Sequence, residues 1–209
     1  EDYAVHVPTN LPLDGVAPLL CAGVTLWSPI KHWNVTKGTK VAVMGLGGLG
    51  HMGVKFAVAM GAEVTVLSHS PSKEADAKAM GAHHFVSTKD PEIFKKYAKS
   101  FDLILNTVSA EVDINQYLNL LAQDGTLVVI GLPGKPYSVH AGVLLGARRS
   151  MAGSMIGGIP EMQEMLDFCG EHNILSDVEV IKADYINKAY ERTVASDVKY
   201  RFVIDGATF

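Results

Sequence analysis

The sequence predicts an α/β fold with a doubly wound parallel sheet of six strands. From Lys40 onward, short apolar and β-branched runs alternate with longer stretches of helical periodicity, which is typical of repeated βαβ units. Runs such as residues 41–44 are continuously apolar, as expected of parallel strands that helices cover on both faces. The predicted strands are residues 41–44, 64–67, 84–87, 103–106, 126–130 and 150–156.

Helix and turn signals between these runs support the same arrangement. Gly61 stands where the first predicted helix must end, and Asp124-Gly125 is a turn signal before the fifth strand. The predicted helices are residues 49–60, 72–80, a stretch that begins near residue 91, 114–121 and 159–171.

The two ends of the chain differ from this pattern. Residues 1–20 contain three prolines and little periodicity, and the chain after residue 171 predicts short strands at 178–181 and 200–204 with a short helix between them. Neither end carries enough periodic apolar sequence for a core of its own. We therefore expect both ends to be pieces of a second domain.

The composition is that of a globular protein and excludes several classes of partner. Hydrophobic residues make up 48% of the 209 residues, and the formal net charge is -4. This charge gives no general attraction to nucleic acid or to an anionic membrane. Since no apolar run approaches the roughly 18 residues of a membrane span and no signal peptide is evident, the prediction is a cytoplasmic protein.

A glycine-rich turn between the first strand and the first helix is the strongest functional signal. Residues 45–50 read G-x-G-x-x-G, in which the glycines permit a tight turn, a close approach of a pyrophosphate and close packing of helix on strand. The free N–H groups at the helix start then face the phosphates. The residues predicted to bind a dinucleotide here are Gly45, Gly47, Gly48, Leu49 and Gly50.

Two other interpretations of this turn remain open. It can be a purely structural turn, or the loop of a methyltransferase that binds S-adenosylmethionine. A methyl-donor site usually places an acidic residue at the end of the next strand, where this chain has Ser68. The βαβ context and Ser68 together favour a dinucleotide in a Rossmann-type sheet.

The segment after the second strand distinguishes NAD from NADP. NAD sites use an Asp or Glu roughly 20 residues past the glycines to bind the ribose 2′-hydroxyl. This chain instead offers two hydroxyls, an imidazole and an ammonium, from Ser68, His69, Ser70 and Lys73. These groups suit a 2′-phosphate, so the predicted cofactor is NADP(H).

Five blocks of sequence, taken in order, resemble the cinnamyl alcohol dehydrogenases, which are zinc-dependent medium-chain alcohol dehydrogenases. The resemblance implies an NADP(H)-dependent enzyme that interconverts aldehydes and primary alcohols, aromatic or allylic ones included, and a homodimer joined at the edge of the Rossmann sheet. It also implies that this chain lacks most of a GroES-like N-terminal catalytic domain. The blocks are residues 17–25, 45–53, 68–73, 153–158 and 197–205.

The resemblance also implies domain limits. Residues 1–20 are expected to be the edge of the catalytic domain, residues 21–170 the dinucleotide-binding domain, and residues 171–209 a return segment of the catalytic domain. The chain alone is expected to bind cofactor without turning over a substrate.

The same resemblance assigns roles to further residues. Cys21 resembles the third protein ligand of a catalytic zinc, and Thr25 resembles the hydroxyl beside the nicotinamide. A catalytic zinc takes three protein ligands, so the other two would have to come from upstream sequence. Loop residues past the carboxyl ends of the later strands are expected to contact the cofactor: Thr107, Val108, Gly131, Leu132, Ser154 and Ile156.

Two other functions stay open from the sequence. One is a zinc-independent quinone or enoyl reductase of the same superfamily, against which Cys21 argues. The other is a stand-alone NADPH-binding regulatory module. His51 is given no chemical role and Cys169 is expected to be a small buried apolar side chain.

Overall fold

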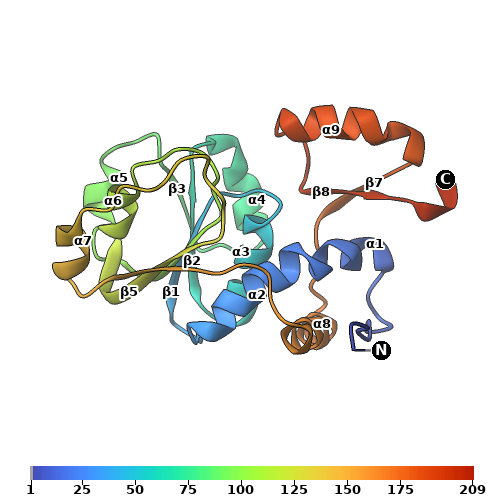
Figure 1. The fold of residues 1–209 in the computed structure, drawn as a ribbon, viewed down its shortest axis with the longest axis horizontal. Helices are drawn as coiled ribbons and strands as arrows, with labels where there is room; N and C mark the ends of the chain where they lie inside the picture. Colours follow the sequence, from blue (N-terminus) through green and yellow to red (C-terminus); the bar gives the residue numbers. More distant parts are fainter. Residues whose placement is uncertain (1) are drawn as a thin grey trace.

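The computed structural model describes residues 2–209 and contains one six-stranded parallel sheet (Figure 1). The strand order is β3-β2-β1-β4-β5-β6, which is the doubly wound order, and the predicted fold class is confirmed. The strands are β1 (Lys40–Met44), β2 (Glu63–Ser68), β3 (His84–Ser87), β4 (Phe101–Asn106), β5 (Leu121–Val129) and β6 (Ser150–Gly153).

The apolar runs form strands because both faces of the sheet are buried. In β1, Val41 and Val43 belong to one core cluster, whereas Ala42 and Met44 belong to the other. Side chains of a strand alternate between faces, so a continuous apolar run supplies both clusters at once.

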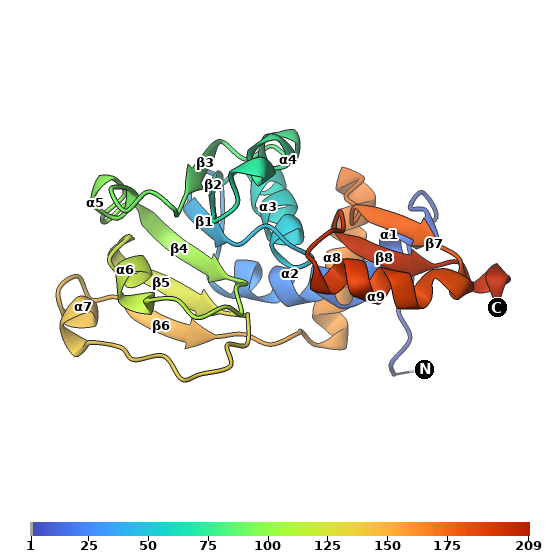
Figure 2. The same ribbon diagram turned by 90° about the horizontal axis from the view of Figure 1, so that it is seen from above.

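Helices cover the two faces unequally, as Figure 2 shows from above. Side chains of α2 (Ala22–His32), α3 (Gly50–Ala59) and α8 (Ile159–His172) build the first core cluster. The second cluster is covered by shorter helices, α5 (Ile93–Lys96) and α6 (Ile114–Leu118). The remaining elements of this part of the chain are α1 (Leu13–Val16), η1 (Ala17–Leu20), η2 (Pro71–Lys73), α4 (Glu74–Ala79) and α7 (Ala141–Leu145).

Helix α2 is the largest element that the sequence did not predict. Trp27 on this helix lies 5.5 Å from the ring of Phe56 and 4.8 Å from the ring of Phe168, measured between ring centroids. Pro29 and Gly23, residue types that usually interrupt a helix, both stand inside it. Within residues 2–209 no single helix could cross a membrane; only the bent pair Leu13–Leu20 and Ala22–His32 together passes by length and composition.

Three predicted boundaries were wrong: the end of the sixth strand, the end of the helix before the fifth strand, and the start of the fifth strand, predicted at residue 126 and found at Leu121. The strand predicted for 150–156 ends at Gly153, and Ile156, three residues later, takes a left-handed φ of 50°. The helix predicted for 114–121 ends at Leu118, and Leu121 already begins β5. Its carbonyl accepts a hydrogen bond of 2.9 Å from Arg149 Nε, which fixes this early part of the strand.

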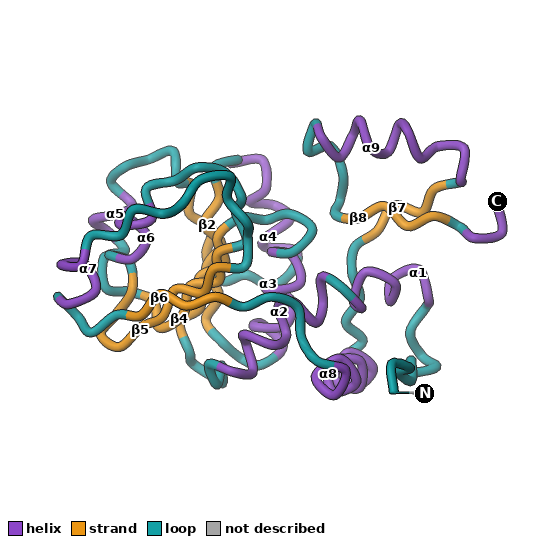
Figure 3. Tube along the Cα trace, viewed as in Figure 1, coloured by secondary structure: helices purple, strands orange, loops and turns teal. Residues whose placement is uncertain are grey.

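The C-terminal residues form a separate layer beside the sheet, in which α9 lies over a pair of strands (Figure 3). Strands β7 (Val178–Ile181) and β8 (Arg201–Ile204) pair in parallel, and α9 (Ile186–Val194) connects them. Two 3-10 turns complete this part of the chain: η3 (Ala183–Tyr185) and η4 (Gly206–Thr208).

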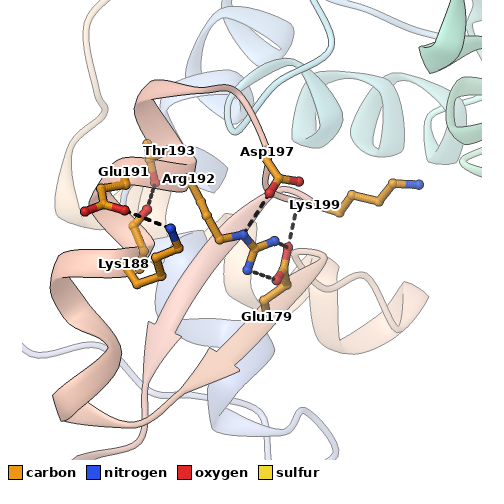
Figure 4. A network of polar contacts seen from close by, with 8 residues as sticks. Glu179, Lys188, Glu191, Arg192, Thr193, Asp197 and Lys199 are labelled. Atoms are coloured by element: carbon orange, nitrogen blue, oxygen red, sulfur yellow. Dashed lines mark hydrogen bonds and ion pairs between the residues drawn. The ribbon is translucent and has the colours of Figure 1, made fainter.

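A network of charged groups holds α9 against β7 (Figure 4). Arg192 donates two hydrogen bonds to Glu179, of 2.7 and 3.1 Å, and a third of 3.0 Å to Asp197. Glu179 also accepts the backbone N–H of Lys199 at 3.1 Å. The hydrogen bonds from Arg192 hold the pKa of Glu179 below its usual value. The network therefore fixes the loop that leads into β8.

Candidate functional site

A pocket of about 940 Å³ lies between the glycine-rich turn and the C-terminal layer. It opens at the carboxyl ends of the central strands, which is where open α/β sheets bind ligands. The sequence predicted ten of its lining residues: Gly45, Gly47, Gly48, Leu49, Ser68, His69, Ser70, Lys73, Thr107 and Val108.

The glycine turn is shaped by backbone contacts that a side chain would obstruct. Gly45 has a φ of +89°, and its N–H donates to the Leu67 carbonyl at 2.9 Å. A Cβ on Gly50 would lie 2.0 Å from the carbonyl oxygen of Gly45, whereas a Cβ on Gly47 would meet nothing within 4 Å. Gly50 is thus needed for packing, and Gly47 leaves open space beside the backbone that a diphosphate could occupy.

The loop that follows β4 packs against the glycine turn. Thr107 Oγ1 donates to the Met44 carbonyl at 2.8 Å, which ties the loop after β4 to the end of β1. A Cβ on Gly45 would lie 2.8 Å from Val108 Cγ2. The pocket therefore begins where the neighbouring strands β1 and β4 separate, at the switch point of the sheet.

The end of β2 presents polar and basic groups to the pocket. Ser68 is 7% exposed, and its hydroxyl accepts the N–H of Ser70 at 3.2 Å, while His69 and Ser70 are exposed and Lys73 is half-buried. None of the described residues that line this pocket is an Asp or a Glu. The electrostatics therefore favour an anionic ligand over one that needs a carboxylate partner.

Arg201 is a pocket residue that the sequence did not predict. From β8 it reaches the glycine turn, where its Nε donates to the Gly48 carbonyl at 3.2 Å. A Cβ on Gly48 would lie 2.5 Å from that Nε, so the glycine is needed for this approach. Apolar side chains of the C-terminal layer complete the wall: Ile181, Ile186, Ala189, Tyr190, Phe202 and Ile204.

His51 connects the helix after the glycine turn with the C-terminal layer. It is fully buried, with Nδ1 3.2 Å from the Gly47 carbonyl and Nε2 3.0 Å from the Ser176 hydroxyl. Burial, helped by the charge of Lys55, lowers the pKa of His51 to about 4. The imidazole is therefore neutral near pH 7 and acts as a buried polar tie.

The other predicted site residues do not line the pocket. Gly131, Leu132, Ser154 and Ile156 lie in loops after β5 and β6, where Leu132 is 87% exposed and Ile156 58% exposed. Gly50 is packed inside the turn as described above. Gly157 in the loop after β6 would place a Cβ 2.6 Å from a methyl group of Val24, so this loop lies against α2. Thr25 is on the same helix and is 7% exposed.

Cys21 is exposed and directly precedes α2, where its carbonyl accepts the N–H of Thr25 at 3.1 Å. Among residues 2–209 no group of three or more His, Cys, Asp or Glu side chains is arranged to hold a metal ion. A catalytic zinc needs three protein ligands, so the residues present do not form a zinc site by themselves. Cys169 is buried, as expected, and burial raises its pKa to about 12.

Comparison with known proteins gives a consistent family. The family described as zinc-binding dehydrogenase matches residues 48–171. NADP-dependent alcohol dehydrogenase C 1 of Mycolicibacterium smegmatis is 60% identical over 208 residues, which cover all of this chain and 60% of that protein. Aldehyde reductase YahK of Escherichia coli is 53% identical over 197 residues, covering 94% of this chain and 56% of its own length.

Solved structures give the same result. A cinnamyl alcohol dehydrogenase of Sorghum bicolor superposes with a TM-score of 0.96 at 46% identity, over 99% of this chain and 59% of that one. A cinnamyl alcohol dehydrogenase of Helicobacter pylori, solved with NADP(H), has a TM-score of 0.89 at 44% identity, over 98% of this chain and 58% of that one. The chain thus spans about 60% of the length of the relatives it matches.

Two glycines of the turn should respond differently to the same substitution. Gly50→Ala is expected to destabilise the fold, because its Cβ would overlap the Gly45 carbonyl at 2.0 Å. Gly47→Ala is expected to change the free energy of unfolding by less than about 0.5 kcal/mol, since its Cβ enters open space. Urea unfolding measures both; equal losses of stability would contradict the proposed packing of the turn.

His51 should make stability depend on pH. The unfolded imidazole takes up a proton below about pH 6.5, whereas the folded one resists protonation until about pH 4. Stability is therefore expected to fall as pH falls from 6.5 to 4, by about 3 kcal/mol in total from this group. Urea unfolding at several pH values should show that His51→Gln loses this part of the slope. The matched control His32→Gln, at an exposed position, should keep it, and equal slopes in all three proteins would refute the assignment.

Proposed function

This chain belongs to the zinc-binding dehydrogenase family, and we propose that its pocket binds NADP(H) for an oxidoreductase acting on alcohols and aldehydes. One observation carries the proposal. The pocket beside the glycine turn has Ser68 and Lys73 at the end of β2, and no described residue that lines it is acidic. A cofactor with a 2′-phosphate fits this set of groups, and one that needs a carboxylate partner for its ribose does not.

The residues present fit the cofactor and divide into two groups. The backbone of Gly45, Gly47 and Leu49 would hold the diphosphate at the start of α3, and Arg201 would add a positive charge on the opposite wall. Ser68, His69, Ser70 and Lys73 would bind the 2′-phosphate end, with Lys73 as the permanent cation. When bound, the nicotinamide supplies or accepts a hydride.

The substrate class rests on the relatives. Their names include an NADP-dependent alcohol dehydrogenase, an aldehyde reductase and cinnamyl alcohol dehydrogenases. We propose primary alcohols and the corresponding aldehydes, aromatic or allylic ones included, as substrates of the whole protein. Thr25 and the loops after β4, β5 and β6 would then lie on the nicotinamide side.

Zinc is proposed only for a protein that contributes ligands beyond those of this chain. Cys21 offers one exposed thiol, and two further protein ligands are needed. Metal analysis of a protein with the length of the relatives, with and without Cys21→Ser, tests this role. Loss of bound zinc in the variant is the expected result, and an unchanged zinc content would contradict the role of Cys21.

Lys73 should decide the preference between the two cofactors. Lys73→Ala is expected to weaken NADPH binding about tenfold, because a charge-assisted hydrogen bond to the phosphate is lost. NADH binding should stay unchanged, since NADH lacks that phosphate. Calorimetric titration of the 209-residue chain measures both. Lys78→Ala is the matched control, because Lys78 pairs with Glu74 at 2.6 Å and does not line the pocket. An unchanged NADPH affinity in Lys73→Ala would overturn the proposed phosphate role.

We also propose a homodimer joined at the outer edge of β6. In the described part of the chain β6 pairs only with β5, so its other edge offers unpaired backbone groups. Met155 and Ile156, which follow this edge, are 86% and 58% exposed.

Sedimentation equilibrium should give twice the mass of one chain. Met155→Asp combined with Ile156→Asp should shift the protein to monomer, because charges would then be buried in the interface. Leu145→Asp, at a position on α7 that is 81% exposed, should leave the dimer intact. A monomer for the unmodified protein would refute the proposal.

A further inference from the structure

Tyr200 occupies a central place between the glycine turn and the 2′-phosphate end of the pocket. It directly precedes β8 and is 4% exposed. Its ring stacks on His51, with centroids 5.0 Å apart and an interplanar angle of 14°. The ammonium nitrogen of Lys73 lies 4.7 Å from the centroid of the same ring. Tyr200 therefore contacts both Lys73, at the 2′-phosphate end of the pocket, and His51, which follows the glycine turn.

The ring is held in place by hydrogen bonds at its hydroxyl and its backbone. The hydroxyl donates to Asp76 Oδ2 at 2.8 Å, and the backbone N–H donates to the Asp177 carbonyl at 2.8 Å. Burial, together with the hydrogen bond to Asp76, raises the pKa of Tyr200, so the phenol keeps its proton and remains a donor. Asp76 also accepts Lys199 Nζ at 2.8 Å. The ring is thus held in a fixed position beside Lys73.

Contact with an aromatic ring leaves Lys73 able to bind an anion, whereas a salt bridge to a carboxylate would not. A carboxylate beside Lys73 would neutralise its charge and repel a phosphate. An aromatic face attracts the ammonium without neutralising its charge, so the N–H groups that point away from the ring stay available for an oxyanion. Asp76 is close enough to Lys73 for their charges to interact, but both of its oxygens already accept hydrogen bonds, from Lys199 and Tyr200. His51 is neutral and adds no positive charge beside the ammonium.

We propose that Tyr200 is a positioning residue for Lys73, whose ring holds the ammonium ready for the 2′-phosphate and so increases the preference for NADPH over NADH. Lysine has a long flexible side chain, and ordering it on binding costs conformational entropy. The ring reduces that cost before the cofactor arrives. The inference rests on the proposed function, because it assumes that the pocket binds NADP(H).

A purely structural role for Tyr200 makes a different prediction. Loosening the C-terminal layer would weaken the binding of NADPH and NADH alike, because Arg201 and the glycine turn serve the part that both cofactors share. The quantity that separates the two roles is the ratio of the two dissociation constants in the 209-residue chain.

Calorimetric titration of four variants measures this ratio. Tyr200→Leu should reduce the preference for NADPH about fivefold, which corresponds to about 1 kcal/mol. Tyr200→Phe keeps the ring and should keep the ratio within about twofold. In a Lys73→Ala background, Tyr200→Leu should change the ratio no further, because the two residues act as one unit. Tyr97→Leu is the matched control and should leave the ratio unchanged, because the Tyr97 ring carries the ammonium of Lys96 at 5.4 Å but does not line the pocket.

Three results would overturn the inference. They are an unchanged ratio in Tyr200→Leu, an equal loss in Tyr200→Phe, and a further loss from Tyr200→Leu when Lys73 is already alanine. If the unmodified chain shows no preference for NADPH, the proposed function fails and this inference fails with it. A clear preference that ignores every change at Tyr200 refutes the inference alone.

A spectroscopic measurement keeps the inference testable if Tyr200→Leu does not fold. In the unmodified chain, the ε-methylene protons of Lys73 should resonate upfield of those of the other lysines, because they lie near the face of an aromatic ring. Loss of that signal in Lys73→Ala assigns it. Lys73 protons at ordinary shifts would show that the ammonium does not rest on the ring, which contradicts the proposed positioning.

Discussion

The pocket exists because the C-terminal layer folds back onto the glycine turn, and this contact depends on the absence of side chains in the turn. Arg201 reaches the Gly48 carbonyl only because Gly48 has no Cβ in the way. His51, four residues after Gly47, extends the same contact to Ser176 in the C-terminal part of the chain. The glycine turn therefore leaves space for a diphosphate and also binds the C-terminal layer, which forms the opposite wall of the pocket.

Acidic groups in and beside the C-terminal layer pair with cations that do not line the pocket. Asp177 pairs with Lys55 at 2.7 Å, Glu179 pairs with Arg192, and Asp76 on α4 pairs with Lys199. None of the three cations, Lys55, Arg192 and Lys199, is among the residues that line the pocket. The cations that do line the pocket, Lys73 and Arg201, form no salt bridge with a described carboxylate, although the charge of Lys73 acts on Asp76. They therefore remain available to an anionic ligand. We regard this distribution as the electrostatic basis of the proposed cofactor preference.

The sequence predicted those parts of the fold and site that depend on local patterns. Six strands followed from the apolar runs, because parallel strands buried on both faces leave a continuous signal. The glycine turn and the segment from Ser68 to Lys73 followed from a motif whose spacing has a direct structural cause. Helix α2 was missed because Gly23 and Pro29, which usually interrupt a helix, stand inside it.

Contacts between distant residues could not be predicted in the same way. Arg201 and Gly48 are 153 positions apart, and Asp76 and Tyr200 are 124 apart, so no local pattern joins them. The left-handed φ of Ile156 could not be predicted either, because β-branched residues rarely adopt this conformation. A residue such as Tyr200 becomes interpretable only when the fold shows what its ring touches.

The residues proposed for chemistry and those proposed for cofactor binding lie on different elements, and packing connects them. Thr25 and Cys21 belong to the start of α2, whereas the glycine turn begins α3. Trp27 on α2 packs edge-on against Phe56 on α3 at 5.5 Å, and both rings are fully buried. Gly53 also approaches closely, since a Cβ there would lie 3.0 Å from a methyl group of Leu26. Because a close-packed interior transmits small shifts, the packing of α2 against α3 fixes the position of Thr25 relative to the glycine turn. The position of Thr25 relative to the glycine turn is therefore set by core side chains of α2 and α3, and hydride transfer in the proposed enzyme would depend on it.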